Sequence, residues 1–181
     1  MAKTQDELPW DAELVKRVGE AAKTARDGKS AAWLSAQTEK LGYKISTSVI
    51  AKLDSGHRGS VLSVAELLII AAALDVPPLA LLFPKLPDGN VEVVPGKPVS
   101  SLDAYLWAAG ENQGSAAARL IEESRKRDGL MKELAHLHVM QALEGDDVLR
   151  KSKEREISSV RDAIAHADAT IRELGGVLDY A

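Results

Sequence analysis

A run of small polar and basic side chains in the first half of the chain has the spacing of one helix face. Successive helical residues are rotated by about 100°, so these side chains lie opposite Ile50 and Leu53. They are Thr47, Ser48, Ala51, Lys52 and Ser55. Short hydroxyl, methyl and ammonium groups fit base edges in the major groove of DNA, provided that the apolar face holds the helix on its own domain. The spacing therefore predicts a DNA-reading helix over 47–54.

Four further residues are placed to contact the DNA backbone. Ser30 and Ser46 are predicted to cap two helices, and the free backbone N–H groups at helix starts can hold phosphates. Lys44 and Arg58 flank the reading helix and carry the charge that a phosphate anchor needs. The expected DNA contacts are therefore these four residues together with the five on the reading face.

The charge of this region differs from that of the whole chain. A net charge of −4 at pH 7 is by itself unfavourable for a nucleic-acid partner. Between residues 16 and 58, however, nine basic and four acidic residues give a local charge of +5. The basic residues are Lys16, Arg17, Lys23, Arg26, Lys29, Lys40, Lys44, Lys52 and Arg58. A segment this positive can neutralise phosphates, and a solvated basic helix face is the alternative.

Five short helices are expected to position the reading face. Ser30, Ser46 and Ser63 are predicted N-caps, and Gly42 supplies the left-handed backbone that ends a helix. The fourth helix is apolar on most faces, so we expect it at the centre of the core. The expected helices cover 11–26, 31–40, 47–54, 64–74 and 78–83. These elements predict a compact bundle in an all-α protein.

The segment from Ile45 to Gly56 (ISTSVIAKLDSG) resembles the recognition region of the Cro/CI (XRE-type) family of helix-turn-helix transcriptional regulators. The resemblance covers about 70 residues and includes the Ala-Leu-Asp-Val segment at 73–76 and the Leu-Leu-Phe-Pro segment at 81–84. It implies a five-helix lambda-repressor-like bundle, sequence-specific DNA binding and repression by blocking polymerase. Two features depart from the family: Ala31 stands where a Gln is usual, and the stretch over 34–46 is several residues longer.

The composition divides the chain into a helix-turn-helix domain over 1–84, a linker over 85–100 and a helical domain over 101–181. The linker is rich in proline, glycine and β-branched residues, with 91–94 as a candidate strand. In the last domain, two long helices are expected over 115–143 and 147–178, joined at a Glu-Gly-Asp segment. The second of these helices carries the most regular apolar spacing in the chain.

That apolar seam has steps of three and four residues, and it needs a partner helix. Its members are Ile157, Val160, Ile164, Ala167, Ile171, Leu174 and Leu178. One arrangement is an antiparallel hairpin within the chain. The other is a coiled coil between two chains, a homodimer through Ile157, Val160, Ile164, Ile171, Leu174 and Leu178. Both stay open at this point.

Other candidate sites in the second half are weaker. Two basic clusters, 125–127 and 150–155, lie among acidic residues, which favours ion pairs along the helices over DNA contact. Glu133 and His136 have the spacing of a carboxylate-bridged metal site, but the chain has no second Glu-x-x-His. We expect no metal and no cofactor. The sequence has no phosphate loop and no nucleophile motif, so we do not expect an enzyme.

The chain also indicates where the protein resides. The amino-terminal segment 1–13 has no apolar run after its charged start, and the chain has no cysteine. We therefore expect a cytoplasmic protein. The apolar stretch over 61–83 is not expected to span a membrane, because Glu66, Asp75 and two prolines interrupt it.

The leading prediction is a sequence-specific DNA-binding transcriptional regulator, a repressor of cellular or phage immunity type. Its partner is double-stranded DNA, and a symmetric dimer would read half-sites about 34 Å apart. The alternative is an antitoxin-like or other protein-interaction module that acts mainly through its C-terminal helices.

Overall fold

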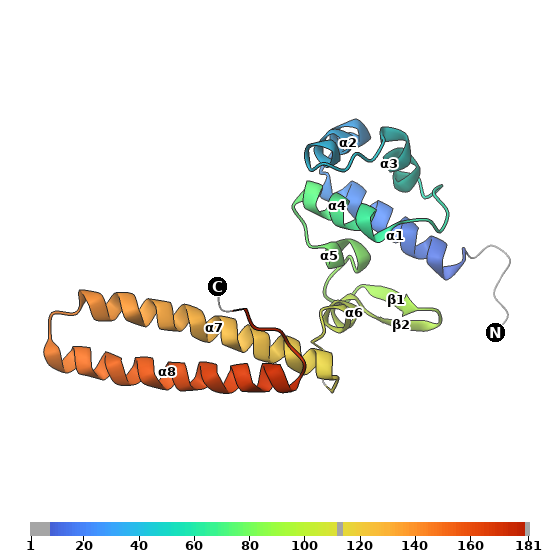
Figure 1. Ribbon diagram of the computed structural model, residues 1–181. Helices are drawn as coiled ribbons and strands as arrows, with labels where there is room; N and C mark the ends of the chain where they lie inside the picture. The colour runs from blue at the N-terminus through green and yellow to red at the C-terminus, as the bar shows by residue number, and fades with distance from the viewer. Residues whose placement is uncertain (1–7, 112–113, 180–181) are drawn as a thin grey trace. The chain divides into compact units, whose positions relative to one another are not determined.

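The computed structural model describes residues 8–111 and 114–179 of the chain (Figure 1). These residues are mostly helical and form two compact units, Met1–Ala108 and Ala109–Ala181. No secretory signal is expected in the amino-terminal segment 1–13. Residues 1–7 of that segment lie outside the described residues. The division after Ala108 differs from the expected one, which placed a linker over 85–100.

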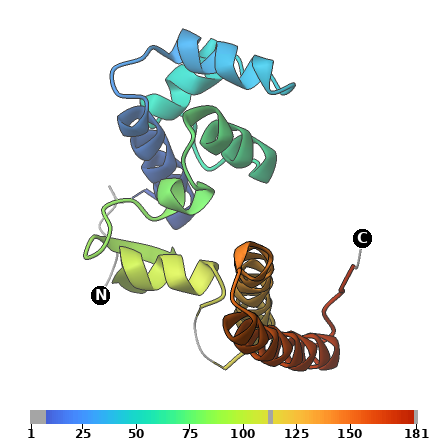
Figure 2. The ribbon, with the colours of Figure 1, turned by 90° about the vertical axis from the view of Figure 1, so that its left-hand side faces the viewer.

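Five helices of the first unit pack together (Figure 2). They are α1 (Trp10–Ala25), α2 (Ala31–Lys40), α3 (Thr47–Asp54), α4 (Val64–Leu74) and α5 (Pro78–Leu82). Ser30, Ser46 and Ser63 each accept a hydrogen bond from a backbone N–H in the first helical turn, as predicted. α1 instead begins directly after Pro9, and no side-chain cap precedes it.

The core of this bundle draws on all five helices and on the turn between α2 and α3. Its buried members are Val15, Val18, Ala22, Leu34, Ile45, Ile50, Leu53, Ile70, Ala71 and Leu81. The expectation that α4 forms the centre of the core was wrong. Only Ile70 and Ala71 of this helix are buried, whereas Val64 is 73% exposed and Leu68 is exposed as well. α4 is apolar on most faces, but only one face of the helix packs against the neighbouring helices.

The expected linker is ordered structure. Strands β1 (Asn90–Val94) and β2 (Lys97–Ser100) form an antiparallel hairpin, with Val91 paired to Val99. Helix α6 (Ser101–Ala108) follows the hairpin directly. Phe83, Val91 and Ala104 form a small second core that joins the end of α5, the hairpin and α6. The apolar residues of this segment are therefore buried against each other, so the segment belongs to the first unit.

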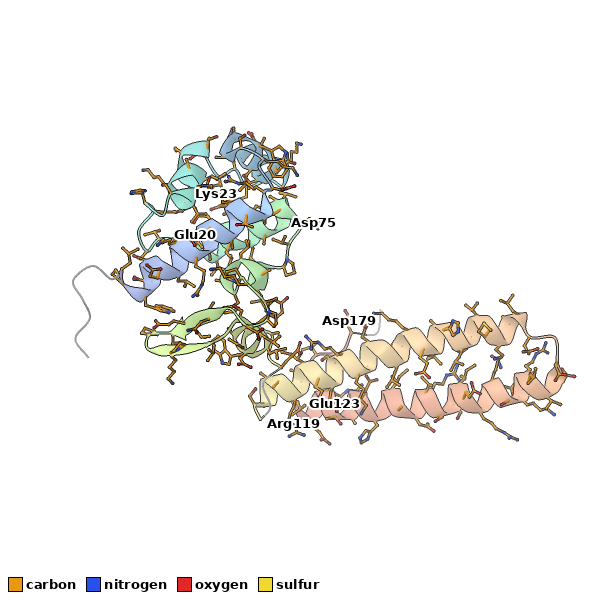
Figure 3. All side chains as sticks on the ribbon, turned by 180° about the vertical axis from the view of Figure 1, so that it is seen from behind. Glu20, Lys23, Asp75, Arg119, Glu123 and Asp179 are labelled. Atoms are coloured by element: carbon orange, nitrogen blue, oxygen red, sulfur yellow. The ribbon has the colours of Figure 1, made fainter. Side chains whose placement is uncertain are left out.

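The second unit is an antiparallel pair of long helices, α7 (Ala116–Leu143) and α8 (Asp147–Glu173). The side chains of the two helices meet along their length (Figure 3). Asp146 caps α8, and Gly175 in the left-handed region ends it before the expected residue 178. The seam residues Ile157, Val160 and Ile164 are buried within this hairpin. The intramolecular hairpin is thus the arrangement that the structure contains.

Within 8–111 and 114–179, none of the helices is both long enough and apolar enough to cross a membrane.

Candidate nucleic-acid interface

The apolar face of α3 is held tightly against α1. Ile50 and Leu53 are almost fully buried in the core of the first unit. At the crossing with α1, Gly19 lies so close to α3 that a Cβ atom there would overlap the carbonyl oxygen of Leu53. Only a glycine permits this approach, because a larger residue would force the two helices apart. The orientation of α3 is therefore set by direct backbone contact with α1.

A buried ion pair fixes the far end of α3. Arg26, at the end of α1, donates from Nη2 to Oδ2 of Asp54 at 2.7 Å. The Arg26 side chain is only 4% exposed, and its Nε and Nη1 have no hydrogen-bond partner among the described residues. The guanidinium is thus buried with one partner, Asp54. Arg26 is one of the nine basic residues expected to neutralise phosphates, but its burial removes it from that set.

The opposite face of α3 is exposed. Thr47, Ser48, Ala51, Lys52 and Ser55 are all accessible, as the helical spacing predicted. Ser48 lies 3.0 Å from the cap Ser46, hydroxyl to hydroxyl, and the Ser55 hydroxyl donates to the carbonyl oxygen of Lys52 at 3.2 Å. These local bonds leave acceptor capacity on each hydroxyl. The structure therefore brings the five predicted reading residues together on one surface.

The long turn between α2 and α3 is anchored by Thr38. Its hydroxyl donates to the carbonyl oxygen of Ser35 at 2.9 Å and accepts from the N–H of Ile45 at 3.0 Å. Ile45 is buried, and Gly42 has a positive φ of 85° where α2 ends. Leu41 is exposed, because the chain leaves the helix at this point. The extra residues thus form an ordered turn, held at both ends.

The two predicted phosphate anchors have carboxylate partners. Lys44 Nζ lies 3.0 Å from Glu39 Oε1 in an exposed pair. Arg58 is largely buried and donates to Glu66, whose second carboxylate oxygen accepts the N–H of Ser63 at 2.9 Å. Arg58 therefore links the end of α3 to the capping box of α4, and it is less accessible to a phosphate than expected.

The environment of Glu66 alters its pKa. Burial acts to raise the pKa of this carboxyl group, but the hydrogen bonds from Arg58 and from the backbone of Ser63 outweigh it. The pKa of Glu66 consequently lies below its ordinary value of 4.5. Glu66 is ionised at neutral pH and holds Arg58 in place.

Comparisons with family models, with curated proteins and with solved structures find no match.

Four lysines of the basic segment have no carboxylate within ion-pair distance among the described residues. They are Lys23, Lys29, Lys40 and Lys52. Lys29, just before the α2 cap, lies 4.4 Å from the centroid of the Trp33 ring. Lys52 is the one on α3 itself. The cations available to a phosphate are therefore fewer than the nine basic residues counted in the sequence. They lie at the starts and ends of helices α1 to α3.

Sequence reasoning missed the residues that support the reading face. Gly19, Arg26 and Thr38 contact α3 or the turn before it, yet none was proposed for this role. Their signals were a glycine inside a helix, a basic residue at a helix end and a threonine on a buried face. Each signal is ambiguous until the partner, far along the chain, is known.

In the second unit, the basic cluster 125–127 is engaged in ion pairs, and in the cluster 150–155 Arg150 lies 3.7 Å from Asp147. Arg125 lies 2.6 Å from Glu111 and Lys126 lies 3.5 Å from Glu123. Arg127 crosses from α7 to α8 and contacts Asp168 at 2.6 Å. As for the histidine pattern, no group of three or more ligand-type side chains in the described part of the chain could hold a metal ion. Glu133 and His136 are both exposed on α7.

Proposed function

We propose that the protein is a sequence-specific DNA-binding transcriptional regulator that reads the major groove with α3. One observation carries the proposal: α3 is locked to α1 by backbone contact and a buried ion pair, yet its opposite face is exposed and bears three hydroxyl groups, Ala51 and Lys52. A rigid helix with an accessible hydrogen-bonding face is what direct readout requires.

The arrangement of the first unit supports a lambda-repressor-like bundle. Five short helices in the expected order surround one core, and α2 and α3 begin at serine caps, where free backbone N–H groups can hold phosphates. On this proposal the protein represses transcription by occupying an operator. Lys44 and Arg58 contribute less than expected, since their carboxylate partners compete with phosphate.

The packing of the second unit bears on how many chains would bind an operator. The seam residues Ile157, Val160, Ile164 and Ile171 are buried within one chain, so a homodimer through them would require α8 to separate from α7. A coiled coil between two chains is therefore disfavoured. We propose that the hairpin is intramolecular and that a monomer reads an asymmetric site.

The test is selection of bound duplexes from a random library, followed by fluorescence anisotropy on the selected site. The full chain should enrich one defined sequence. Lys52→Ala combined with Ser48→Ala should relax the preference and weaken specific binding by ~10-fold or more, as loss of base contacts does. Lys97→Ala is the matched control, because Lys97 is an equally exposed lysine on β2. Equal, weak binding to all sequences would overturn the proposal.

A second candidate function is a protein-interaction module, and one feature of the hairpin tip favours it. Leu143 is 77% exposed and Val148 is 76% exposed, and the neighbouring Val139 and Leu149 are exposed too. Apolar groups gathered on a surface often mark a protein contact. The DNA experiment separates the two functions: replacing Leu143 and Val148 by Ser should leave a DNA reader unaffected, whereas it should abolish partner binding by an interaction module.

A further inference from the structure

The first unit contains a pocket that the proposed DNA reading does not use. It has a volume of about 940 Å³ and lies between α1, the end of α5, the turn after it and β1. This volume falls within the range of roughly 300–1,000 Å³ that is usual for small-molecule sites. Ala21, Ala80, Phe83 and Leu86 supply apolar lining. The pocket is therefore large enough for a small organic ligand with an apolar body.

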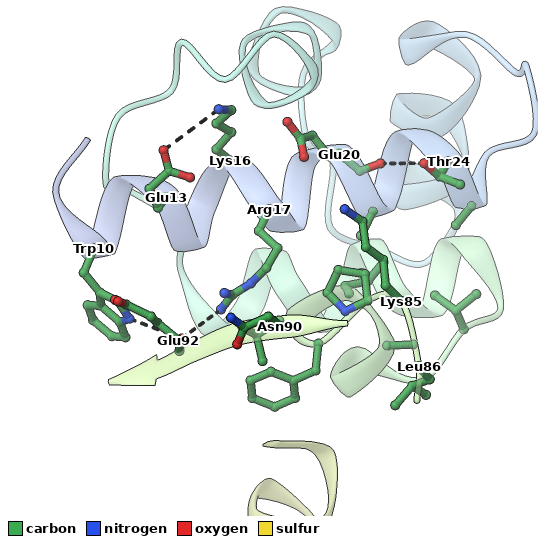
Figure 4. Close-up of a pocket in the computed structure, with 18 of the residues that line it drawn as sticks. Trp10, Glu13, Lys16, Arg17, Glu20, Thr24, Lys85, Leu86, Asn90 and Glu92 are labelled. Carbon is green, nitrogen blue, oxygen red and sulfur yellow. Dashed lines mark hydrogen bonds and ion pairs between the residues drawn. The ribbon is translucent and has the colours of Figure 1, made fainter. Parts of the chain in front are cut away.

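Two cationic side chains reach into this pocket from different walls. Arg17 extends from α1 toward β1, and Lys85 extends from the turn after α5 toward α1 (Figure 4). Asn90 lies below them on β1 and adds an amide group (Figure 4). Two cations and an amide at one end of a pocket form a suitable recognition group for a carboxylate.

Arg17 is only partly satisfied by the protein. Its Nη2 donates to the carbonyl oxygen of Glu92 at 3.3 Å, and the same oxygen accepts from Trp10 Nε1 at 3.3 Å. Its Nε is buried and has no partner among the described residues. Burial lowers the pKa of Arg17, although the charges of Glu13 and Glu92 act in the opposite direction. The protein therefore satisfies only part of the hydrogen-bonding capacity of this guanidinium.

The lining also contains three acidic residues, Glu13, Glu20 and Glu92. Glu13 is paired with Lys16 at 3.9 Å, and Glu20 is exposed. The Glu92 side chain lies beside Trp10, at the end of the pocket away from Lys85 (Figure 4). Among the described residues, Arg17 and Lys85 are the lining cations without a carboxylate within ion-pair distance.

We propose that this pocket binds a small organic monocarboxylate, with the carboxylate between Arg17 and Lys85 and the apolar body against Phe83 and Leu86. The carboxylate would accept from the Arg17 guanidinium and from the Lys85 ammonium. This site is independent of the proposed DNA reading, since none of the predicted DNA-contacting residues lines the pocket.

The experiment titrates the full chain with phenylacetate and, separately, with the neutral phenylacetamide of the same shape. The readouts are the indole N–H resonance of Trp10 and the Nε–H resonance of Arg17 in two-dimensional NMR spectra. Phenylacetate should shift both resonances saturably, with a Kd of roughly 1 mM, as suits a fragment-sized ligand. The indole resonances of Trp33 and Trp107, which lie outside the pocket lining, should stay in place.

Two variants test the cations. Lys85→Gln and Arg17→Lys should each weaken phenylacetate binding by about tenfold, because one loses the charge and the other loses the guanidinium fork. Lys97→Gln on β2 is the matched control and should bind as the parent chain does. The proposal is overturned if phenylacetamide binds equally well, if all three indole resonances shift together, if no shift occurs, or if Lys85→Gln weakens binding no more than Lys97→Gln does.

Discussion

α3 in the first unit and α8 in the second are both amphipathic helices, but their two faces are used differently. α3 buries its apolar face against α1 and leaves its polar face almost free of ion pairs. α8 buries its seam against α7, and the polar residues around that seam pair across the hairpin, as Arg127 does with Asp168. α3 therefore has an unoccupied hydrogen-bonding surface, whereas α8 uses both apolar and charged groups to hold its own unit together.

The comparison shows that a regular apolar pattern is not by itself evidence of a binding surface. The seam of α8 is the most regular apolar pattern in the chain, and its residues are buried against α7 of the same chain. The reading face of α3 has no apolar residue apart from one alanine, and it remains exposed.

Replacing Asp54 by Ala should have the largest effect on the first unit. The change leaves the Arg26 guanidinium buried without a counter-charge, so we expect a loss of ~3–5 kcal/mol in unfolding free energy. Chemical denaturation followed by circular dichroism measures it. Asp128→Ala removes the exposed Asp128–Lys132 pair of α7 and should cost less than about 1 kcal/mol. Equal costs would show that the Arg26–Asp54 pair is not buried as described.

Replacing Ile164 by Ala tests the seam of α8. The side chain is buried between the two long helices, and the cavity should destabilise the second unit by ~3 kcal/mol. In an intramolecular hairpin, the unfolding midpoint of parent and variant is independent of protein concentration. A midpoint that rises with concentration would instead indicate that the seam joins two chains.

Replacing Gly19 by Ala tests the contact between α1 and α3. The added methyl group overlaps the backbone of Leu53, so we expect a loss of ~2–3 kcal/mol and weaker DNA binding as α3 shifts. Gly129→Ala in α7 is the matched control. It meets no atom within 4 Å and should stabilise its helix by ~0.5–1 kcal/mol. If both changes were stabilising, the close approach of α1 and α3 would be refuted.

The smallest effect concerns the pH dependence of the Arg58–Glu66 pair. The pKa of Glu66 is lowered in the folded chain, so its contribution to stability is complete above the ordinary value of 4.5 and is lost as the pH falls through the lowered value. The stability difference between the parent chain and Glu66→Gln should therefore shrink as the pH falls below 4.5. Thermal unfolding across this acid range measures the difference. A constant difference would contradict the lowered pKa.

Much of the helical framework could be predicted because its signals are local. The caps Ser30, Ser46 and Ser63 each bond to a residue three positions later. The faces of α3 and α8 follow from a period of 3.6 residues. The hairpin of β1 and β2 was less accessible to such reasoning, because proline and glycine are common to linkers and to tight turns. Its order depends on burial of Phe83, Val91 and Ala104 together.

The sequence by itself determined the order of the helices, the exposed residues of α3 and the apolar seam of α8, because these depend on neighbours within a few positions along the chain. Only the tertiary structure decided that Arg26 pairs with Asp54, that α4 leaves Val64 exposed and that Arg17 and Lys85 share a pocket. Each of these depends on which distant segments meet, and hence on how all the helices pack at once. The reading face was therefore visible in the sequence, whereas its support was not.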